Sequence, residues 1–273
     1  MWQRLLTDSF CIMGIINLSP QSFYYATPTY DDALRCAEQM VLDGADILDI
    51  GAIATNPTIN INSDIPSVQA ELDSVIPFIE LLSKNLDIKI SVDTYRADVM
   101  RESIAHGAHM INDQRALTEI NALETAVKLN VPVCLMHHFN PPRTAGSSSK
   151  ETVLSHIISD LKKQVERCLF AGMSTENIIL DPGFGGGSFG KNADENFYLL
   201  SRLEKITALD FPILVGLSRK SFLGELCHAD IDNRLAASIA AAVIAVQKGA
   251  LIVRVHDVKA TKDALQVMNT VLG

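Results

Sequence analysis

Short apolar runs alternate with longer amphipathic stretches along the 273-residue chain, and this alternation constrains the fold more than any other feature. The runs are about four to seven residues long and lack strict polar alternation, which is typical of parallel strands buried on both faces. The fourth run is the shortest. The predicted strands cover residues 11–17, 45–51, 88–94, 109–113, 131–137, 178–183, 212–218 and 251–257.

The stretches between the runs place apolar residues at the i, i+3, i+4 spacing of amphipathic helices. The predicted helices cover residues 31–43, 67–83, 96–106, 119–129, 150–171, 194–206, 232–248 and 259–271. Eight strand–helix units in strict order favour a parallel sheet with right-handed crossovers, and eight strands can close a barrel. We therefore predict an α/β fold, a (β/α)8 TIM barrel forming a single domain over residues 1–273.

An open doubly wound sheet is the alternative architecture. Such a sheet usually carries a glycine-rich phosphate turn after its first strand. Here the first predicted strand ends in Asn17-Leu18-Ser19-Pro20 instead. The chain length also suits a barrel, which typically takes about 250 residues.

The composition of the chain argues against some classes of binding partner. The formal net charge of −9 argues against nucleic acid or an anionic membrane as the main partner, although a local basic pocket could still bind an anionic substrate. No apolar run approaches the roughly 20 residues of a membrane span, and the amino terminus lacks a signal-peptide pattern. The five cysteines are scattered without a CxxC pair, which is typical of reduced thiols in a cytoplasmic protein.

Polar residues recur where the predicted strands end, although a buried parallel strand should be apolar. One such residue alone could cap a helix or form a turn, as Asp181-Pro182-Gly183 could. A polar set at the same end of every strand instead indicates one shared site at the carboxyl end of the barrel. The set comprises Asn17, Asp49, Thr55, Asp93, Asn112, Asp113, His137, Asp181, Ser218, Arg219, Lys220, Arg254 and His256.

The first half of this set suits phosphate. Arg254 and His256 belong to the last strand and Asn17 to the first, and these strands adjoin when a barrel closes. Arginine offers paired donors to phosphate oxygens, and a protonated His256 would add another. Asn17 could bind phosphate or a Mg²⁺ ion held by it.

The second half, Asp93, Asn112, Asp181 and Lys220, suits a different ligand. Inward-facing carboxylates and an amide fit a flat heterocycle rich in N–H donors, and Lys220 could donate to a ring oxygen or nitrogen.

Metal-dependent hydrolysis is a competing reading, suggested by His137 and His138. Adjacent residues of a strand point to opposite faces, so this pair could not easily bind one zinc ion. The first strand is also not followed by the H-x-H pattern that would favour zinc.

Several segments together resemble dihydropteroate synthase, from about residue 10 to the carboxyl terminus. They are Ile12 to Pro20, Ser91 to Thr94, Ile111 to Asp113, Leu180 to Gly185, Gly216 to Gly224 and Val253 to Val258. The combination of S-R-K-S-F-L-G with R-V-H-D-V is the specific part. The resemblance implies condensation of 6-hydroxymethyl-7,8-dihydropterin diphosphate with 4-aminobenzoate, giving 7,8-dihydropteroate and pyrophosphate for folate synthesis.

The same resemblance implies a role for each residue that matches the family's motifs. The pterin would bind Asp93, Asn112, Asp181 and Lys220, and the diphosphate would bind Asn17, Arg254 and His256, with Mg²⁺ on Asn17. Catalysis would depend on Asp93, Lys220, Arg254 and His256. The 4-aminobenzoate side would include Thr55, Pro57 and Ser221. A homodimer is also implied.

The sequence departs from the family pattern in three loops. Where the family has T-P-D-S-F-S-D-G-G, residues 19–27 read S-P-Q-S-F-Y-Y-A-T, and where it has G-G-E-S-T-R-P-G, residues 51–58 read G-A-I-A-T-N-P-T. The segment from Asp181 to Lys191 carries about three extra residues. The first two loops build the 4-aminobenzoate pocket in the family, so that pocket has altered electrostatics here.

Two further hypotheses follow from these departures. The chain could be a paralogue that binds the pterin diphosphate but lacks this condensation or uses another acceptor. It could also be a pterin-dependent methyltransferase on a related barrel. The retained Arg254 and His256 argue against the methyltransferase, because a methyl-folate needs no diphosphate site.

Overall fold

The protein forms a closed ring of parallel strands. The computed structural model describes residues 10–18, 29–52 and 65–272. Eight strands lie in the order β6-β5-β4-β3-β2-β1-β8-β7. They are β1 (Cys11–Asn17), β2 (Ile47–Gly51), β3 (Lys89–Asp93), β4 (Met110–Asp113), β5 (Val133–Met136), β6 (Ile178–Asp181), β7 (Leu214–Val215) and β8 (Ile252–Val255).

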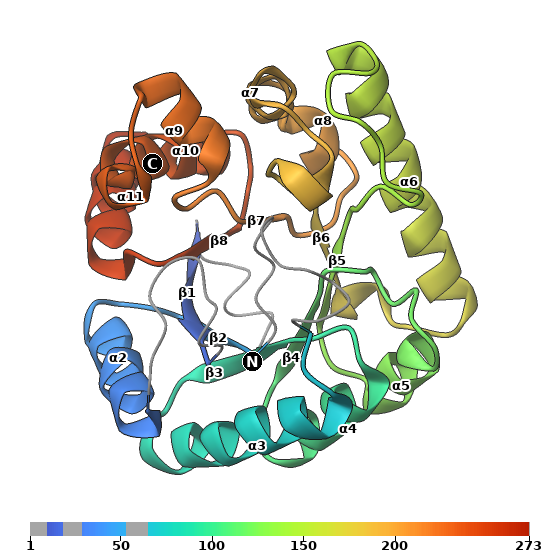
Figure 1. The fold of residues 1–273 in the computed structure, drawn as a ribbon, viewed down its shortest axis with the longest axis vertical. Helices are drawn as coiled ribbons and strands as arrows, with labels where there is room; N and C mark the ends of the chain where they lie inside the picture. Colours follow the sequence, from blue (N-terminus) through green and yellow to red (C-terminus); the bar gives the residue numbers. More distant parts are fainter. Residues whose placement is uncertain (1–9, 19–28, 53–64, 273) are drawn as a thin grey trace.

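The two ends of this sheet meet. An isolated parallel bridge joins Leu180 to Ile213, and the Leu180 N–H donates to the Pro212 carbonyl at 2.9 Å. The sheet therefore curls into a barrel around which the helices stand (Figure 1), and the open doubly wound alternative is excluded.

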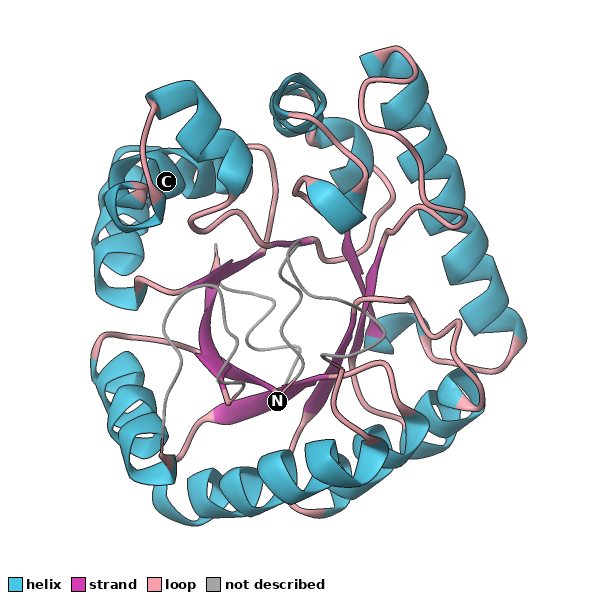
Figure 2. Ribbon diagram, viewed as in Figure 1, coloured by secondary structure: helices cyan, strands magenta, loops and turns pink. Residues whose placement is uncertain are grey.

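The helices form an outer layer around the strands (Figure 2). They are α2 (Tyr30–Leu42), α3 (Val68–Asn85), α4 (Ala97–Ala105), α5 (Ala122–Leu129), α6 (Lys150–Phe170), α7 (Ala193–Ser201), α8 (Glu204–Thr207), α9 (Ser221–Cys227), α10 (Leu235–Gln247) and α11 (Val258–Leu272). The helix predicted over 194–206 is divided into α7 and α8, and α9 was not predicted. Within the described ranges, no helix combines the length and apolar character needed to cross a membrane.

The shortest strand is β7, with two residues, and the prediction that the fourth strand is the shortest is wrong. Pro212 has no N–H to donate to a neighbouring strand, and Gly216 follows the strand directly. These residues limit regular pairing to Leu214 and Val215.

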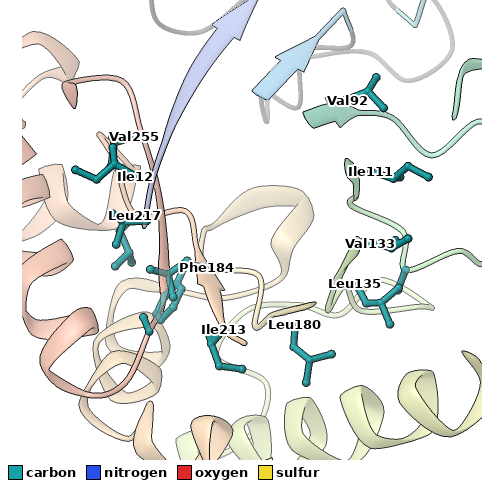
Figure 3. Packing of buried hydrophobic residues seen from close by; sticks show 14 of the residues in the cluster. Ile12, Val92, Ile111, Val133, Leu135, Leu180, Phe184, Ile213, Leu217 and Val255 are labelled. Atoms are coloured by element: carbon teal, nitrogen blue, oxygen red, sulfur yellow. The ribbon is translucent and has the colours of Figure 1, made fainter. Parts of the chain in front are cut away.

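The apolar core has two layers. The inner layer fills the barrel and consists of Cys11, Met13, Ile47, Met110, Cys134, Ile179, Leu214 and Ile252. The outer layer packs the strands against the helices, and Figure 3 shows part of it, including Val133, Leu135 and Leu180. Because the inner layer fills the barrel at the amino-terminal side of the strands, polar groups face the interior nearer the carboxyl ends of the strands.

Candidate active site

The pleat of the strands gathers polar side chains above the inner apolar layer. Side chains alternate between the two faces of a strand, so a residue two positions beyond an inner-layer residue also faces the interior. Four polar residues stand in this relation: Asp49, Asn112, Asp181 and Arg254, which follow Ile47, Met110, Ile179 and Ile252. Asp93 pairs in register with Asn112 and joins this level.

Arg254 links two carboxylates across the barrel. Its Nε donates to Asp49 Oδ2 at 2.6 Å, and its Nη2 donates to Asp93 Oδ2 at 2.8 Å. Asn112 Nδ2 donates to the same Asp49 oxygen at 2.9 Å. The other oxygen, Asp49 Oδ1, is buried and has no hydrogen-bond partner among the described residues. This oxygen can therefore accept a donor from a ligand.

Asp93 carries a strongly perturbed carboxyl. Burial raises its pKa well above the usual range, although Arg254 acts in the opposite direction. The side chain of Gln114 donates to both Asp93 oxygens, each at 2.9 Å. Perturbed groups of this kind cluster at functional sites.

Asp181 and Lys220 are oppositely charged groups that interact electrostatically with each other. Asp181 Oδ1 accepts the Gly183 N–H at 2.7 Å, and burial raises the pKa of Asp181 to about 6. Burial lowers the pKa of Lys220 to about 8, with Asp181 opposing the shift. The Lys220 ammonium lies 4.1 Å from the centroid of the Phe189 ring, a cation–π contact.

The protonation state of His256 in the structure differs from the one considered in the sequence analysis. Burial, with Arg254, Arg219 and Lys220 nearby, lowers the pKa of His256 to about 3. Its Nδ1 lies 3.0 Å from Ser218 Oγ. The neutral form of His256 is therefore favoured at neutral pH, whereas a protonated side chain against phosphate was considered in the sequence analysis.

Three strand-end residues of the predicted set do not face the site. The carboxylate of Asp113 accepts the backbone N–H groups of Arg115 and Leu117 and so closes a turn. The His137 ring is fully buried and contacts His156 of α6. Arg219 makes a paired salt bridge with Asp257.

The direction of these three side chains follows from local geometry. Asp113 and His137 each follow an inward position, occupied by Asn112 and Met136, so the pleat turns them toward the helices. Arg219 lies beyond β7 in a left-handed conformation with φ of 56°, and its guanidinium is held by Asp257 and by the carbonyls of Ile231 and Asp232. The prediction that the whole set meets at one mouth is therefore wrong for these three residues.

Of the remaining predicted site residues, two lie at the ends of described elements and two lie outside the described residues. Asn17 is the last residue of β1, and Ser221 is the first residue of α9, directly after Lys220. Thr55 and Pro57 lie outside the described residues.

Two residues of the site were not selected from the sequence. Asp49 was noted at a strand end but was not assigned to the pterin group, although its position two residues after Ile47 would have indicated it. Gln114 lies in the turn after β4, where no periodic signal places a side chain.

Comparisons with known proteins agree with this geometry. The sequence profile of the pterin-binding enzymes matches residues 13–256. A dihydropteroate synthase of Haemophilus influenzae is 46% identical over 94% of this chain and 92% of that protein. The chain belongs to the dihydropteroate synthase family. This result confirms the resemblance stated from the sequence.

Solved structures of dihydropteroate synthases share the fold. The enzyme of Coxiella burnetii, in complex with pteroic acid, has a TM-score of 0.92 at 48% identity, covering 96% of this chain and 92% of that chain. The enzyme of Xanthomonas albilineans with 4-aminobenzoic acid has a TM-score of 0.88 at 38% identity, covering 97% and 94%. The predicted TIM barrel is therefore confirmed for this member of the family.

The turn that orients Asp181 depends on a glycine. Gly183 has φ of +69°, and a Cβ there would lie 2.2 Å from the backbone oxygen of His137. We expect Gly183→Ala to lower the free energy of unfolding by about 2 kcal/mol or more, because the left-handed backbone disfavours alanine and the carbonyl cannot move away freely. Urea unfolding measures this change.

Gly186→Ala is the matched control in the same loop, because its Cβ would lie 3.4 Å from the nearest atom, an ordinary contact. We expect it to unfold close to the wild type. Equal stability of Gly183→Ala and Gly186→Ala would contradict the role given to Gly183.

Proposed function

We propose that this chain is a dihydropteroate synthase. It condenses 6-hydroxymethyl-7,8-dihydropterin diphosphate with 4-aminobenzoate, and the products are 7,8-dihydropteroate and pyrophosphate. The relatives named above bind pteroic acid and 4-aminobenzoic acid, which supports both substrates. The observation that carries the proposal is the buried acceptor set of Asp49, Asp93, Asn112 and Asp181 with Lys220 beside it.

The pterin is the ligand proposed for this acceptor set. Its ring N–H and amino groups would donate to the carboxylates of Asp93 and Asp181 and to the unpartnered Asp49 Oδ1. Asn112 and Lys220 would complete the ring contacts with one amide and one ammonium group. A carboxylate buried without such donors is costly, so the empty acceptor positions favour a ligand rich in N–H groups.

The diphosphate would lie beside the pterin, against Asn17, Arg254 and His256. Arg254 Nε and Nη2 each donate to a carboxylate, and the guanidinium would offer its other N–H groups to the phosphate oxygens. His256 would act as a neutral donor through its ring N–H rather than as a cation.

Magnesium fits this site only with help from the substrate. No group of three or more His, Cys, Asp or Glu residues among the described positions could hold a metal ion. Mg²⁺ characteristically keeps several waters and binds through one or two protein oxygens plus phosphates. The amide oxygen of Asn17 would supply one such ligand, and bound Mg²⁺ would neutralise charge on the diphosphate.

The reaction then needs no covalent enzyme intermediate. The amine nitrogen of 4-aminobenzoate forms a bond to the exocyclic pterin carbon, and the C–O bond to diphosphate breaks with its electron pair on the leaving oxygen. The amine then loses one proton to solvent. The N–H groups of Arg254 would stabilise the leaving charge, and the carboxylates of Asp93 and Asp181 would stabilise positive charge on the pterin.

The 4-aminobenzoate side remains a prediction from the resemblance. Ser221 would contact this substrate from the amino end of α9, together with Thr55 and Pro57. We also infer a homodimer located in the cytoplasm. Leu226 of α9 and Val267 and Val271 of α11 are exposed apolar residues that a subunit interface could cover, and light scattering should give about twice 29.8 kDa.

The proposal is tested by measuring the formation of 7,8-dihydropteroate from the two substrates in the presence of Mg²⁺. Lys220→Ala is the inactive control, because we expect it to weaken pterin binding while the fold stays intact. Unchanged pterin binding in this variant would show that the assignment of Lys220 is wrong.

The pH dependence of kcat/KM for the pterin diphosphate gives a separate prediction. Asp93 and Asp181 must be ionised to accept N–H donors, and Lys220 must be protonated to donate. Burial raises the pKa of Asp93 to about 7 and that of Asp181 to about 6. We therefore expect kcat/KM to rise over the pH range from about 6 to about 7 and to fall as pH passes about 8.

Initial rates between pH 5 and 9.5 measure this profile. In Lys220→Arg the basic limb should disappear, because arginine stays protonated throughout this range. A basic limb that persists unchanged in Lys220→Arg would contradict the assignment of that limb to Lys220.

A further inference from the structure

The side-chain amide of Gln114 contacts both carboxylate oxygens of Asp93. Its amide nitrogen lies 2.9 Å from Asp93 Oδ1 and 2.9 Å from Asp93 Oδ2. Asp93 is buried, and its Oδ2 also accepts from Arg254. Gln114 therefore supplies a neutral donor to a carboxylate that otherwise depends on the charge of Arg254.

The backbone holds Gln114 in this place. The Asp113 carboxylate accepts the N–H of Arg115 at 2.7 Å and that of Leu117 at 2.9 Å. The Arg115 guanidinium carbon lies 3.9 Å from the centroid of the Tyr95 ring. These contacts hold the residues on the carboxyl side of Gln114 in place. The turn therefore positions the Gln114 side chain beside Asp93.

The charges around Asp93 oppose one another. Asp49 on β2 and Asp113 on β4 disfavour its ionised form, as burial does. Arg254 on β8 favours the ionised form, and Lys220 after β7 also interacts with Asp93. Gln114 favours the ionised carboxylate without adding a charge.

We propose that Gln114 is a positioning residue that keeps the Asp93 carboxylate ionised and oriented toward the pterin while Arg254 engages the diphosphate. This inference rests on the proposed function. A bound diphosphate would compete with Asp93 for the Arg254 guanidinium. The hydrogen bonds from Gln114 to Asp93 would not be subject to this competition. A hydrogen bond to the ionised form of an acid favours that form.

Gln114→Met tests this role, because methionine has a similar length but donates no hydrogen bond. Without the amide, the pKa of Asp93 should rise further, which lowers kcat/KM on the acid limb. We expect about a tenfold loss at pH 6 and less than a twofold loss at pH 9, where Asp93 is ionised in both proteins. Gln114→Glu should shift the limb further, because it places a second carboxylate beside the first.

Gln69→Met is the matched control. Gln69 donates to Asp73 at 2.7 Å on the exposed face of α3, so the same chemical change there should leave the profile unchanged. A loss in Gln114→Met that is equal at pH 6 and pH 9 would indicate a structural role and overturn the proposal. Wild-type rates across the range would overturn it too.

Equilibrium binding separates this inference from the proposed function. Fluorescence titration with 6-hydroxymethyl-7,8-dihydropterin in the presence of pyrophosphate, which would engage Arg254 as the diphosphate does, needs no turnover. If the wild type binds this pterin but makes no dihydropteroate, the proposed reaction fails, while weaker binding by Gln114→Met at pH 6 and equal binding at pH 9 still supports the role of Gln114. Absence of pterin binding by the wild type would overturn both.

Discussion

Arg254→Met is expected to lower the free energy of unfolding by about 3–5 kcal/mol, the cost of removing one partner from a buried ion pair. Arg254 is the cation that contacts both Asp49 and Asp93, and the Asp49 side chain is fully buried. The variant leaves two carboxylates facing each other without their shared donor. Its kcat/KM should also fall by about 10³-fold, since the donors to the leaving diphosphate are lost.

The stability loss in Arg254→Met should depend on pH with a defined sign. The folded-state pKa of Asp93 already lies above its unfolded value because of burial, and losing Arg254 raises it further. Above the unfolded pKa the folded protein then binds more protons than the unfolded chain, so stability falls as pH rises. Urea unfolding should therefore show a larger difference from the wild type at pH 8 than at pH 5.5.

Two variants separate stability from chemistry in this experiment. Adding Asp49→Asn to Arg254→Met should restore part of the stability but none of the activity. Arg96→Met removes a comparable ion pair with the buried Glu71, outside the site, and should lower stability while kcat/KM of the folded protein stays normal. A fully stable, fully active Arg254→Met would contradict the assigned network.

Asp181→Asn should produce the opposite combination, with intact stability and lost activity. An amide presents one oxygen and one NH₂ group where the pterin requires a charged acceptor. We expect kcat/KM for the pterin diphosphate to fall by about 10²- to 10³-fold, since each 1.4 kcal/mol of lost interaction corresponds to a factor of ten.

The stability of Asp181→Asn follows from its titration. Burial raises the pKa of Asp181 to about 6, so the ionised carboxylate costs folding free energy once pH exceeds that value. At pH 8 asparagine avoids this cost and can still accept the Gly183 N–H. We expect a Tm equal to or above that of the wild type, and near-normal kcat/KM in this variant would show that Asp181 does not bind the pterin.

The fold and the inward carboxylates were predictable because both follow from short-range periodicity. The apolar runs placed the strands, and the pleat then directed Asn112 and Asp181 to the same side of the barrel. The same rule would have selected Asp49 as a site residue and would have turned His137 toward α6, where the structure has it.

Other features depend on contacts that no single segment encodes. The neutral state of His256 results from burial beside Arg254, Arg219 and Lys220, which come from different parts of the chain. Gln114 reaches Asp93 through a turn closed by the Asp113 side chain. The bridging position of Arg254 likewise appears only when β2, β3 and β8 come together.

The ratio of the two products tests the central claim most directly. The protein is incubated with the pterin diphosphate, Mg²⁺ and 4-aminobenzoate, and pyrophosphate and 7,8-dihydropteroate are both quantified over the same interval. Condensation by the wild type predicts one dihydropteroate for each pyrophosphate, with both products lost in Asp181→Asn. Pyrophosphate released without dihydropteroate would contradict the account, because the site would then bind and cleave the pterin diphosphate without joining it to 4-aminobenzoate.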